Sequence, residues 1–516
     1  MAEARTGLSF PIRLAYGMGA VGELVFLGMF NTFITIFYNQ AIGLSNTLIG
    51  TAIMLSLLGD AISDPAVGMI SDRWRSRLGR RHPFLFAAPV PTAISLYMIF
   101  SPPAFLTDAT AGNGPDQFPL FLWLCFWTVM SRLFLTLYVI PHFALGGELA
   151  RDPHDRSRLF SINALFGYTT GALFAFVSWG IFLGGTAINR AGVSVPKHLD
   201  AAAYGPLVFT ACGVILVAIL LSAWGTKGQI PNLSAPPALQ ERLSLKIYYK
   251  DLMNALVNRN YRFLMLGFFF FMISAGLTET LGVFANTYVW ELETRQLRWY
   301  GVAAVPAILF GALFAPTLMR LFDRRPVLLC AIIGATVTAQ LPIDLRLLGL
   351  FPVNGSELLL PLLLANAAIT AACIAVAAVA VLSMLGDIAD QNELNNGMRQ
   401  EGLIYSARTF FAKASNSAGH FCAGLMLDLF VRIPFGAVPG KIDSDVVFRL
   451  ALVSGPIMGF AAVIAIPFYA RYDLTRDQHR AILDQLDEKK RQTGSRPACR
   501  NDAVDQRGPL EIRPAS

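Results

Sequence analysis

Residues 57–83 read LLGDAISDPAVGMISDRWRSRLGRRHP, which places two carboxylates inside an apolar run that ends in an arginine-rich loop. The apolar run, residues 46–71, is long enough to cross a bilayer as a helix. Asp60 then lies roughly midway along the span, and Asp64 follows one turn later on the same face. A carboxylate at this depth costs at least about 2.5–3.5 kcal/mol, so two on one face predict a site for a cation. The alternative is a structural network in which these acids pair with basic residues.

The composition extends this interpretation to the whole chain. Of its 516 residues, 54% are hydrophobic and only 15% are charged, which is typical of a polytopic membrane protein. The first apolar run has no cleavage site before it and is interpreted as a retained membrane helix. About twelve transmembrane helices are predicted, near residues 12–38, 46–71, 84–101, 118–149, 160–183, 204–223, 263–289, 300–319, 326–341, 358–385, 403–429 and 446–470.

Basic residues cluster in alternate loops. They follow the second, fourth, sixth and eighth predicted spans and the last one, whereas the intervening loops carry little positive charge. The positive-inside rule then puts both termini in the cytoplasm, with the chain in the plasma (inner) membrane. The formal charge of +7 reflects this topology and contact with anionic membrane lipid, and no nucleic-acid partner is expected.

A polar stretch divides the chain into two similar halves. We expect an N-terminal six-helix bundle over residues 1–224, a cytoplasmic linker over 225–261, a C-terminal six-helix bundle over 262–472 and a cytoplasmic tail over 473–516. SDRWRSRLGRRHP follows the second span of the first half, and MRLFDRRPVLL follows the second span of the second half. Parallel repeats of this kind are typical of the major facilitator fold, whose substrate site lies between the halves near the midplane.

Three stretches resemble the glycoside–pentoside–hexuronide:cation symporters. They are DAISDPAVGMISDRWRSRLGRRHP, VIPHFALGGELARDPHDRSRLF and GDIADQNELNNGMRQEGLIYSARTFFAKASNSAG, and they occur in the order of the family. The resemblance extends over about residues 10–470. It implies a secondary transporter that couples the uptake of a sugar or glycoside to Na⁺ or H⁺ by alternating access.

The resemblance also implies roles for individual residues. Ser63 and Thr136 would complete the oxygen ligands of a cation held by Asp60 and Asp64, with Na⁺ as the metal if the coupling ion is sodium. Lys413, a lone ammonium deep in the eleventh span, needs a counter-ion and would release the aspartates when a cation arrives. Glu23 would accept hydrogen bonds from sugar hydroxyls, or else serve as a structural partner of a nearby cation.

The chain departs from the family at the fourth span. Val139 stands where melibiose-type members carry an acid, and Ser63 stands where the melibiose permease has Asn. Arg132, near the middle of this span, either neutralises Glu23 or Asp60 or binds an anionic substrate such as a uronide. Glu279 in the seventh span is interpreted either as a substrate-binding acceptor or as a structural partner.

A cytoplasmic gate is predicted where acids and arginines meet at the inner ends of the spans. Its expected members are Asp387, Asp390, Glu393, Arg399, Arg156 and Arg158. Exposed ion pairs contribute only about 0–1 kcal/mol each, so such a network can open and close. The alternative is ordinary charge at loop ends.

Three classes of function follow from these features. A symporter is the first, and a translocator of lysolipid or another amphiphile with the same fold is the second. The third, a polytopic enzyme, is disfavoured because the sequence has no HExxH, no Walker loop and no large extramembrane domain. We expect a monomer without a cofactor, whose ligands are a small-molecule substrate and a coupling cation.

Overall fold

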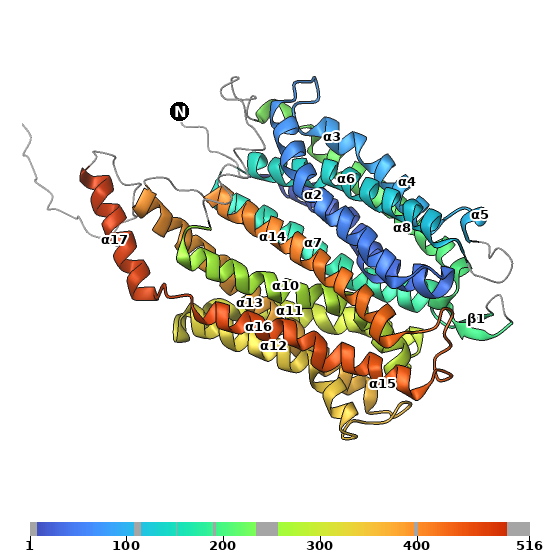
Figure 1. The fold of residues 1–516 in the computed structure, drawn as a ribbon. Coiled ribbons are helices and arrows are strands. Elements are labelled where there is room, and N and C mark those ends of the chain that lie inside the picture. The colour runs from blue at the N-terminus through green and yellow to red at the C-terminus, as the bar shows by residue number, and fades with distance from the viewer. Residues whose placement is uncertain are drawn as a thin grey trace, which may run out of the picture.

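The computed structural model describes residues 8–107, 115–150, 152–188, 192–233, 256–396 and 401–492, and nearly all of them are helical (Figure 1). The α-helices are α1 Phe10–Ile36, α2 Asn46–Arg73, α3 His82–Ala87, α4 Pro89–Phe100, α5 Ala104–Thr107, α6 Gln117–Leu149, α7 Pro153–Val177, α8 Tyr204–Lys227, α10 Arg259–Phe284, α11 Thr294–Phe322, α12 Arg324–Leu347, α13 Leu359–Asn396, α14 Glu401–Leu425, α15 Ser444–Leu452, α16 Met458–Ala470 and α17 Arg476–Gln492.

Shorter elements continue or connect these helices. Five π-helical turns are η1 Phe37–Ile42, η2 Ser178–Phe182, η6 Ala285–Val289, η7 Met426–Val431 and η8 Val453–Ile457. Three 3₁₀ turns are η3 Lys197–Leu199, η4 Ala201–Ala203 and η5 Ile230–Asn232. The strands β1 Thr186–Ile188 and β2 Ser194–Pro196 form an antiparallel hairpin in which Thr186 faces Pro196.

Eleven helical segments of the described chain are long and apolar enough to cross a membrane. The shortest predicted span, residues 326–341, is part of a longer helix, α12. The predicted span at 403–429 corresponds to α14 and η7, which are more polar and pack between α2 and α10. The prediction of a polytopic helical membrane protein is confirmed.

The long helices pack in two groups (Figure 1). In the first group, α1 packs on α7 and α8, α2 on α6, and α4 on α6 and α8. In the second, α11 and α12 pack on α13, and α10 packs on α14 and α16. The groups meet where α2 lies on α14, α7 on α11 and α1 on α10. We call the end of the bundle where α1 ends and α2 begins the outer end, and the opposite end, which carries α17, the inner end.

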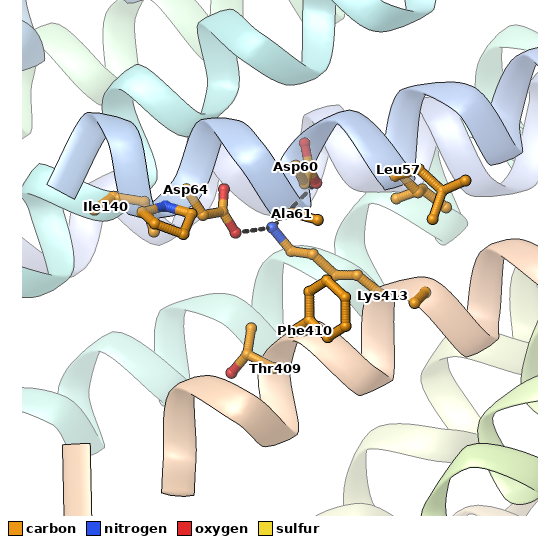
Figure 2. Close-up of a pocket in the computed structure, with 11 residues that line it drawn as sticks. Leu57, Asp60, Ala61, Asp64, Ile140, Thr409, Phe410 and Lys413 are labelled. Carbon is orange, nitrogen blue, oxygen red and sulfur yellow. Dashed lines mark hydrogen bonds and ion pairs between the residues drawn. The ribbon is translucent and has the colours of Figure 1, made fainter. Parts of the chain in front are cut away.

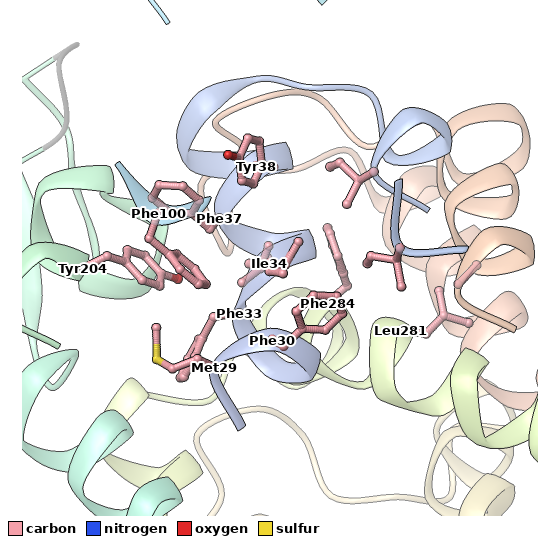
Figure 3. Packing of buried hydrophobic residues seen from close by; sticks show 14 of the residues in the cluster. Met29, Phe30, Phe33, Ile34, Phe37, Tyr38, Phe100, Tyr204, Leu281 and Phe284 are labelled. Carbon is pink, nitrogen blue, oxygen red and sulfur yellow. The ribbon is translucent and has the colours of Figure 1, made fainter. Parts of the chain in front are cut away.

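Aromatic side chains fill the core near the outer end (Figure 3). Phe37 of η1 lies with its ring centroid 5.1 Å from that of Phe100 and 4.9 Å from that of Tyr204. The same apolar cluster includes Phe30 of α1 and Phe284 of α10, so it continues from the first group into the second. Burying such large rings stabilises this end of the contact between the groups.

Glycines allow α2 and α14 to approach at backbone distance. A Cβ atom added to Gly424 would lie 2.3 Å from the carbonyl oxygen of Asn46, and one added to Gly50 would lie 2.9 Å from that of His420. Small residues have this effect in membrane helix pairs because they remove the side chain that would separate the backbones. We call Gly50 and Gly424 the glycine seam, and it aligns α2 with α14 along their outer halves.

Candidate functional site

Four ionisable side chains from three helices meet between the two groups of helices. Asp60 and Asp64 come from α2, Arg132 from α6 and Lys413 from α14, and we call them the buried charge cluster. Asp60, Arg132 and Lys413 each lie near the midpoint of their helix, which is far from water at either end. The four residues therefore form the polar centre of an otherwise apolar interface.

Lys413 links the two aspartates across the interface (Figure 2). Its Nζ lies 3.0 Å from Oδ2 of Asp60 and 2.5 Å from Oδ2 of Asp64. Arg132 Nε donates to the same Oδ2 of Asp60 at 3.1 Å, and a terminal nitrogen of its guanidinium also donates to this oxygen. Thr136 Oγ1 donates to Oδ1 of Asp64 at 2.9 Å. The sequence predicted this meeting of Asp60, Asp64, Thr136 and Lys413, and the structure brings the four together.

Helical periodicity explains why these residues share one location. Asp60 and Asp64 are four residues apart on α2, and Arg132 and Thr136 are four apart on α6, so each pair lies on one face. Each aspartate therefore meets one member of the pair on α6. Ser63 lies about 100° around α2 from Asp64. Its buried Oγ makes no hydrogen bond within the described chain, so Ser63 takes no part in the hydrogen bonds of the cluster.

The cluster is electrically balanced and mostly shielded from solvent. The side chain of Asp60 is 1% exposed and that of Arg132 is 8% exposed, whereas Asp64 is 17% and Lys413 is 26% exposed. Two carboxylates face two cations, so the four side chains carry no net charge when all are ionised. Oδ1 of Asp60 is buried without a hydrogen-bond partner in the described chain. This oxygen is the acceptor that the four-residue network leaves unused.

A cavity of about 260 Å³ opens beside the cluster. Its walls are mainly apolar, and its polar groups are those of the cluster and one threonine. The lining residues are Leu57, Leu58, Asp60, Ala61, Asp64, Pro65, Ile140, Thr409, Phe410, Lys413 and Ala414. Among the described residues, no three His, Cys, Asp or Glu side chains come together as metal ligands. An ion held here would therefore complete its shell with hydroxyl, carbonyl or water oxygens.

Arg132 has the structural partner that one interpretation of the sequence anticipated. Its guanidinium is engaged by Asp60 and also lies over the ring of Phe30, with its carbon atom 5.6 Å from the ring centroid. Glu23 on α1 is half-buried and makes no hydrogen bond or ion pair in the described chain, although the charges of Arg132 and Lys413 act on it. Of the two carboxylates proposed as partners of Arg132, the structure pairs it with Asp60.

Glu279 lies apart from the charge cluster on α10. Its Oε2 is 3.3 Å from Nε2 of His420, whose Nδ1 is 2.7 Å from Oγ1 of Thr280. His420 is buried and follows Lys413 by seven residues, or two turns, on the same face of α14. The sequence interpretation missed His420, although the spacing from Lys413 was the signal that could have found it.

The expected cytoplasmic gate is only partly visible in this structure. Asp387 is 3.1 Å from Arg324 Nε and 3.5 Å from His479 Nε2, and Asp390 is 3.0 Å from the same His479 nitrogen. Arg324 and His479 belong to the same group of helices as these acids. Glu393 lies half-buried on α13.

The arginines of the expected gate lie elsewhere. Arg156 donates to the carbonyls of Ala150 and Gly147 at 3.3 and 3.5 Å, and Arg158 is exposed. Arg399 lies outside the described residues. The acids Asp387 and Asp390 contact Arg324 and His479 in this structure, and their pairing with Arg156 and Arg158 stays a prediction. His479 belongs to α17, which lies within the predicted cytoplasmic tail.

Two groups of membrane helices with ion-paired side chains at their midplane interface define a secondary transporter. The profile of the family described as MFS/sugar transport protein matches residues 15–476. The chain belongs to this family, and its resemblance to the glycoside–cation symporters is confirmed. It is therefore a polytopic transporter with the major facilitator fold and not an enzyme.

Individual relatives agree with this assignment along nearly the full chain. An uncharacterized symporter of Synechocystis is 25% identical over 94% of this chain and 97% of its own length. The lactose permease of Lactobacillus delbrueckii is 24% identical over 92% of this chain and 72% of its own length. Among solved structures, a D-xylose-proton symporter has a TM-score of 0.59 at 14% identity and covers 90% of this chain and 98% of its own. That structural likeness is one of fold alone.

Proposed function

We propose that this transporter couples the uptake of a sugar or glycoside to the entry of one Na⁺ or H⁺ by alternating access. The observation that carries the proposal is the contact of Lys413, from one group of helices, with both Asp60 and Asp64, from the other. An ion that replaces this ammonium changes a bond between the two groups, and alternating access requires such a change.

The charge count supports a monovalent coupling ion. Without Lys413, the remaining Asp60, Asp64 and Arg132 carry a net charge of −1, which one Na⁺ or one proton neutralises. The unused Oδ1 of Asp60, the carboxylate of Asp64 and the hydroxyl of Thr136 are hard oxygen donors, which suits Na⁺. Sodium is therefore our first choice. Protonation of an aspartate, which also releases Lys413, is the second.

For the substrate, we propose a sugar or glycoside whose hydroxyls donate to Glu23. This carboxylate has no partner in the described chain, and a carboxylate can accept two hydroxyl donors at once. Arg132 no longer argues for an anionic substrate such as a uronide, because Asp60 compensates its charge. The lactose permease among the relatives makes a neutral glycoside the first ligand to test.

We further propose that the inner end, where α17 lies, is cytoplasmic, because the basic loops of the sequence belong to this end. The outer end then faces the outside of the cell. Contact with anionic lipid of the inner leaflet follows from the same charge pattern. We propose that the protein acts as a monomer. Exchange of the cytoplasmic and outside assignments would leave the chemistry of the charge cluster unchanged.

The coupling proposal is tested with Asp60→Asn and Asp64→Asn in proteoliposomes. The probe is the sugar, glycoside or uronide that most raises the melting temperature of the purified protein. The screen is run with and without Na⁺ at about 50 mM, roughly fifty times a millimolar dissociation constant. Both variants should lose accumulation driven by an ion gradient and retain part of the exchange of labelled for unlabelled sugar. Asp116→Asn, which removes the same charge from an exposed helix cap, should transport normally.

Two results decide the outcome. Full concentrative uptake by Asp60→Asn or Asp64→Asn would refute the coupling role of the aspartates. Uptake that ignores Na⁺ but collapses with a protonophore would replace Na⁺ by H⁺ as the coupling ion.

A further inference from the structure

A second carboxylate joins the two groups of helices, at the outer end and far from the charge cluster. Asp428 lies in η7, directly after α14, and its carboxylate accepts four hydrogen bonds from the start of α2. The donors are Ser45 Oγ at 2.5 Å, the Asn46 backbone N–H at 3.1 Å, Asn46 Nδ2 at 2.9 Å and the Thr47 backbone N–H at 2.7 Å. Three consecutive residues therefore converge on one side chain of the other group.

This contact takes the place of a helix cap. The first backbone N–H groups of a helix have no partner within it, and they carry the positive end of the helix dipole. Ser45 occupies the N-cap position of α2, but its side chain makes no capping hydrogen bond. The cap is supplied instead by Asp428, from outside the group to which α2 belongs. A carboxylate suits this role because its charge opposes the dipole.

Gln40 makes a second contact of this kind beside it. Its Oε1 accepts from the Tyr288 hydroxyl at 2.9 Å and from the Ala437 backbone N–H at 3.0 Å, and its Nε2 donates to the Pro434 carbonyl at 3.2 Å. Gln40 is 4% exposed, and it too reaches from the first group to the second. The glycine seam lies just inside these contacts. Hydrogen bonds of Asp428 and Gln40 thus join the two groups at the outer end. His198 of η3 adds a further contact, 3.0 Å from Nε2 to Oγ1 of Thr287 in η6.

We propose that Asp428 is the gating residue of the outer end, which holds the transporter closed on that side by capping α2. This inference deepens the proposed function, since the outer end faces outside only if the proposed topology holds. Opening to the outside requires the first turn of α2 to leave the carboxylate of Asp428.

The position of Asp428 also links the gate to the charge cluster. α14 and η7 carry Lys413 and Asp428, fifteen residues apart, and both residues bond to α2. The two contacts have opposite polarity: α14 supplies the cation to the cluster and η7 supplies the anion to the cap. A coupling ion that displaces Lys413 breaks the contact of α14 with Asp60 and Asp64. The hydrogen bonds of the Asp428 carboxylate to the start of α2 then remain.

Cysteine labelling on the two sides of the membrane tests the gate. Ile53 is a buried residue of α2 between the glycine seam and Asp60, and Thr409 is an exposed residue of α14 on the inner side of Lys413 that lines the cavity. Ile53→Cys reports access from outside in intact cells, and Thr409→Cys reports access from inside in inverted vesicles. The probe is a membrane-impermeant maleimide, and the parent chain without the added cysteine gives the background.

Asp428→Ala should raise the labelling rate of Ile53→Cys from outside by about tenfold or more, the effect of losing one charged hydrogen bond on an equilibrium. It should lower the labelling of Thr409→Cys from inside, because an outward-open state closes the inner side. Asp428→Asn keeps one acceptor oxygen and should give an intermediate rate. The matched control is Asp443→Ala, which removes a capping carboxylate at the same end within one group of helices.

Opposite changes in the labelling rates of Ile53→Cys and Thr409→Cys distinguish the opening of a gate from a general loss of packing. Loosened packing would raise labelling at both positions, and that result would overturn the proposal, as would equal rates for Asp428→Ala and Asp443→Ala. If Asp428→Ala fails to fold, Asp428→Asn decides the question by the same two rates. The labelling needs neither sugar nor coupling ion, so a failure of the symport proposal would appear in the Asp60→Asn uptake and not here.

Discussion

Replacing Lys413 by Gln removes the one cation of the charge cluster that comes from the second group of helices. Its Nζ stands 3.0 Å from Asp60 and 2.5 Å from Asp64. Unit charges 3 Å apart interact by about 5.5 kcal/mol at an effective dielectric constant of 20. Partial exposure and the cost of desolvation reduce this value, and removal of one partner from a buried pair typically costs about 3–5 kcal/mol. We expect Lys413→Gln to lose stability in this range when no ion is added.

The same variant should bind the coupling ion more tightly. In the wild-type protein an added Na⁺ competes with the ammonium for the aspartates, whereas in Lys413→Gln it meets a net charge of −1. We expect the dissociation constant for Na⁺ to fall at least about tenfold, which corresponds to 1.4 kcal/mol and is a small part of the pair energy. Ion-driven accumulation of sugar should be lost, because binding of the ion no longer releases a contact between the groups.

Titration of the purified variant with NaCl, followed by calorimetry and by the melting temperature, measures both effects. Choline chloride controls for ionic strength, and Lys441→Gln, at an exposed lysine of an outer loop, controls for the change of residue type. If Lys413→Gln bound Na⁺ no more tightly than the wild type and were as stable without it, Lys413 would not compete with the ion.

Two further predictions concern single contacts. Asp60→Asn and Arg132→Gln should each lower the free energy of unfolding by about 3–5 kcal/mol. The double variant should lose at least about 1 kcal/mol less than the sum of the two losses, as measured by denaturant unfolding. Additive losses would contradict the pairing of Asp60 with Arg132. Burial of His198, in the outer loop between β2 and α8, lowers its pKa from 6.5 to about 3, so the folded protein keeps the ring neutral. Because the unfolded chain binds the proton first, stability should be complete above pH 6.5 and fall by up to about 1.4 kcal/mol per pH unit below it. In His198→Gln, the melting temperature should fall less steeply as the pH drops below 6.5. An unchanged fall would show that other groups cause the loss of stability in acid.

The sequence predicted the centre of the site because buried charges restrict their own partners. Asp60 and Asp64 had to face one direction, four residues apart, and a lone Lys413 at similar depth needed an anion. These constraints are local in sequence and strong in energy, so one arrangement satisfies them. Ser63 lies about 100° around α2 from Asp64 and joins none of the cluster's hydrogen bonds, so its role as a cation ligand stays a prediction.

Contacts that depend on backbone groups or on distant elements left no such pattern. Two of the four hydrogen bonds to Asp428 come from the main chain of α2, and any sequence supplies that main chain. Asp387 meets Arg324 and His479, and His479 comes from α17, beyond the last membrane span. The sequence does not decide whether Arg132 pairs with Glu23 or with Asp60, because that choice depends on how α1, α2 and α6 pack against one another.

The glycine seam also gives the pair α2 and α14 the mechanics of a lever. Gly424 lies eleven residues from Lys413 and twenty-three from the start of α14, or about 16 Å and 34 Å along the helix. A tilt of about 10° around the seam shifts Lys413 by about 3 Å, which is enough to part its ammonium from both aspartates, and shifts the inner tip of α14 by about 6 Å. A tilt around the glycine seam thus produces about twice the displacement at the inner tip of α14 that it produces at Lys413. The displacement at the inner end of α14 depends on the distance along the helix between the glycine seam and Lys413. Moving the glycines by one turn would therefore change the size of the inner opening without altering any charged residue.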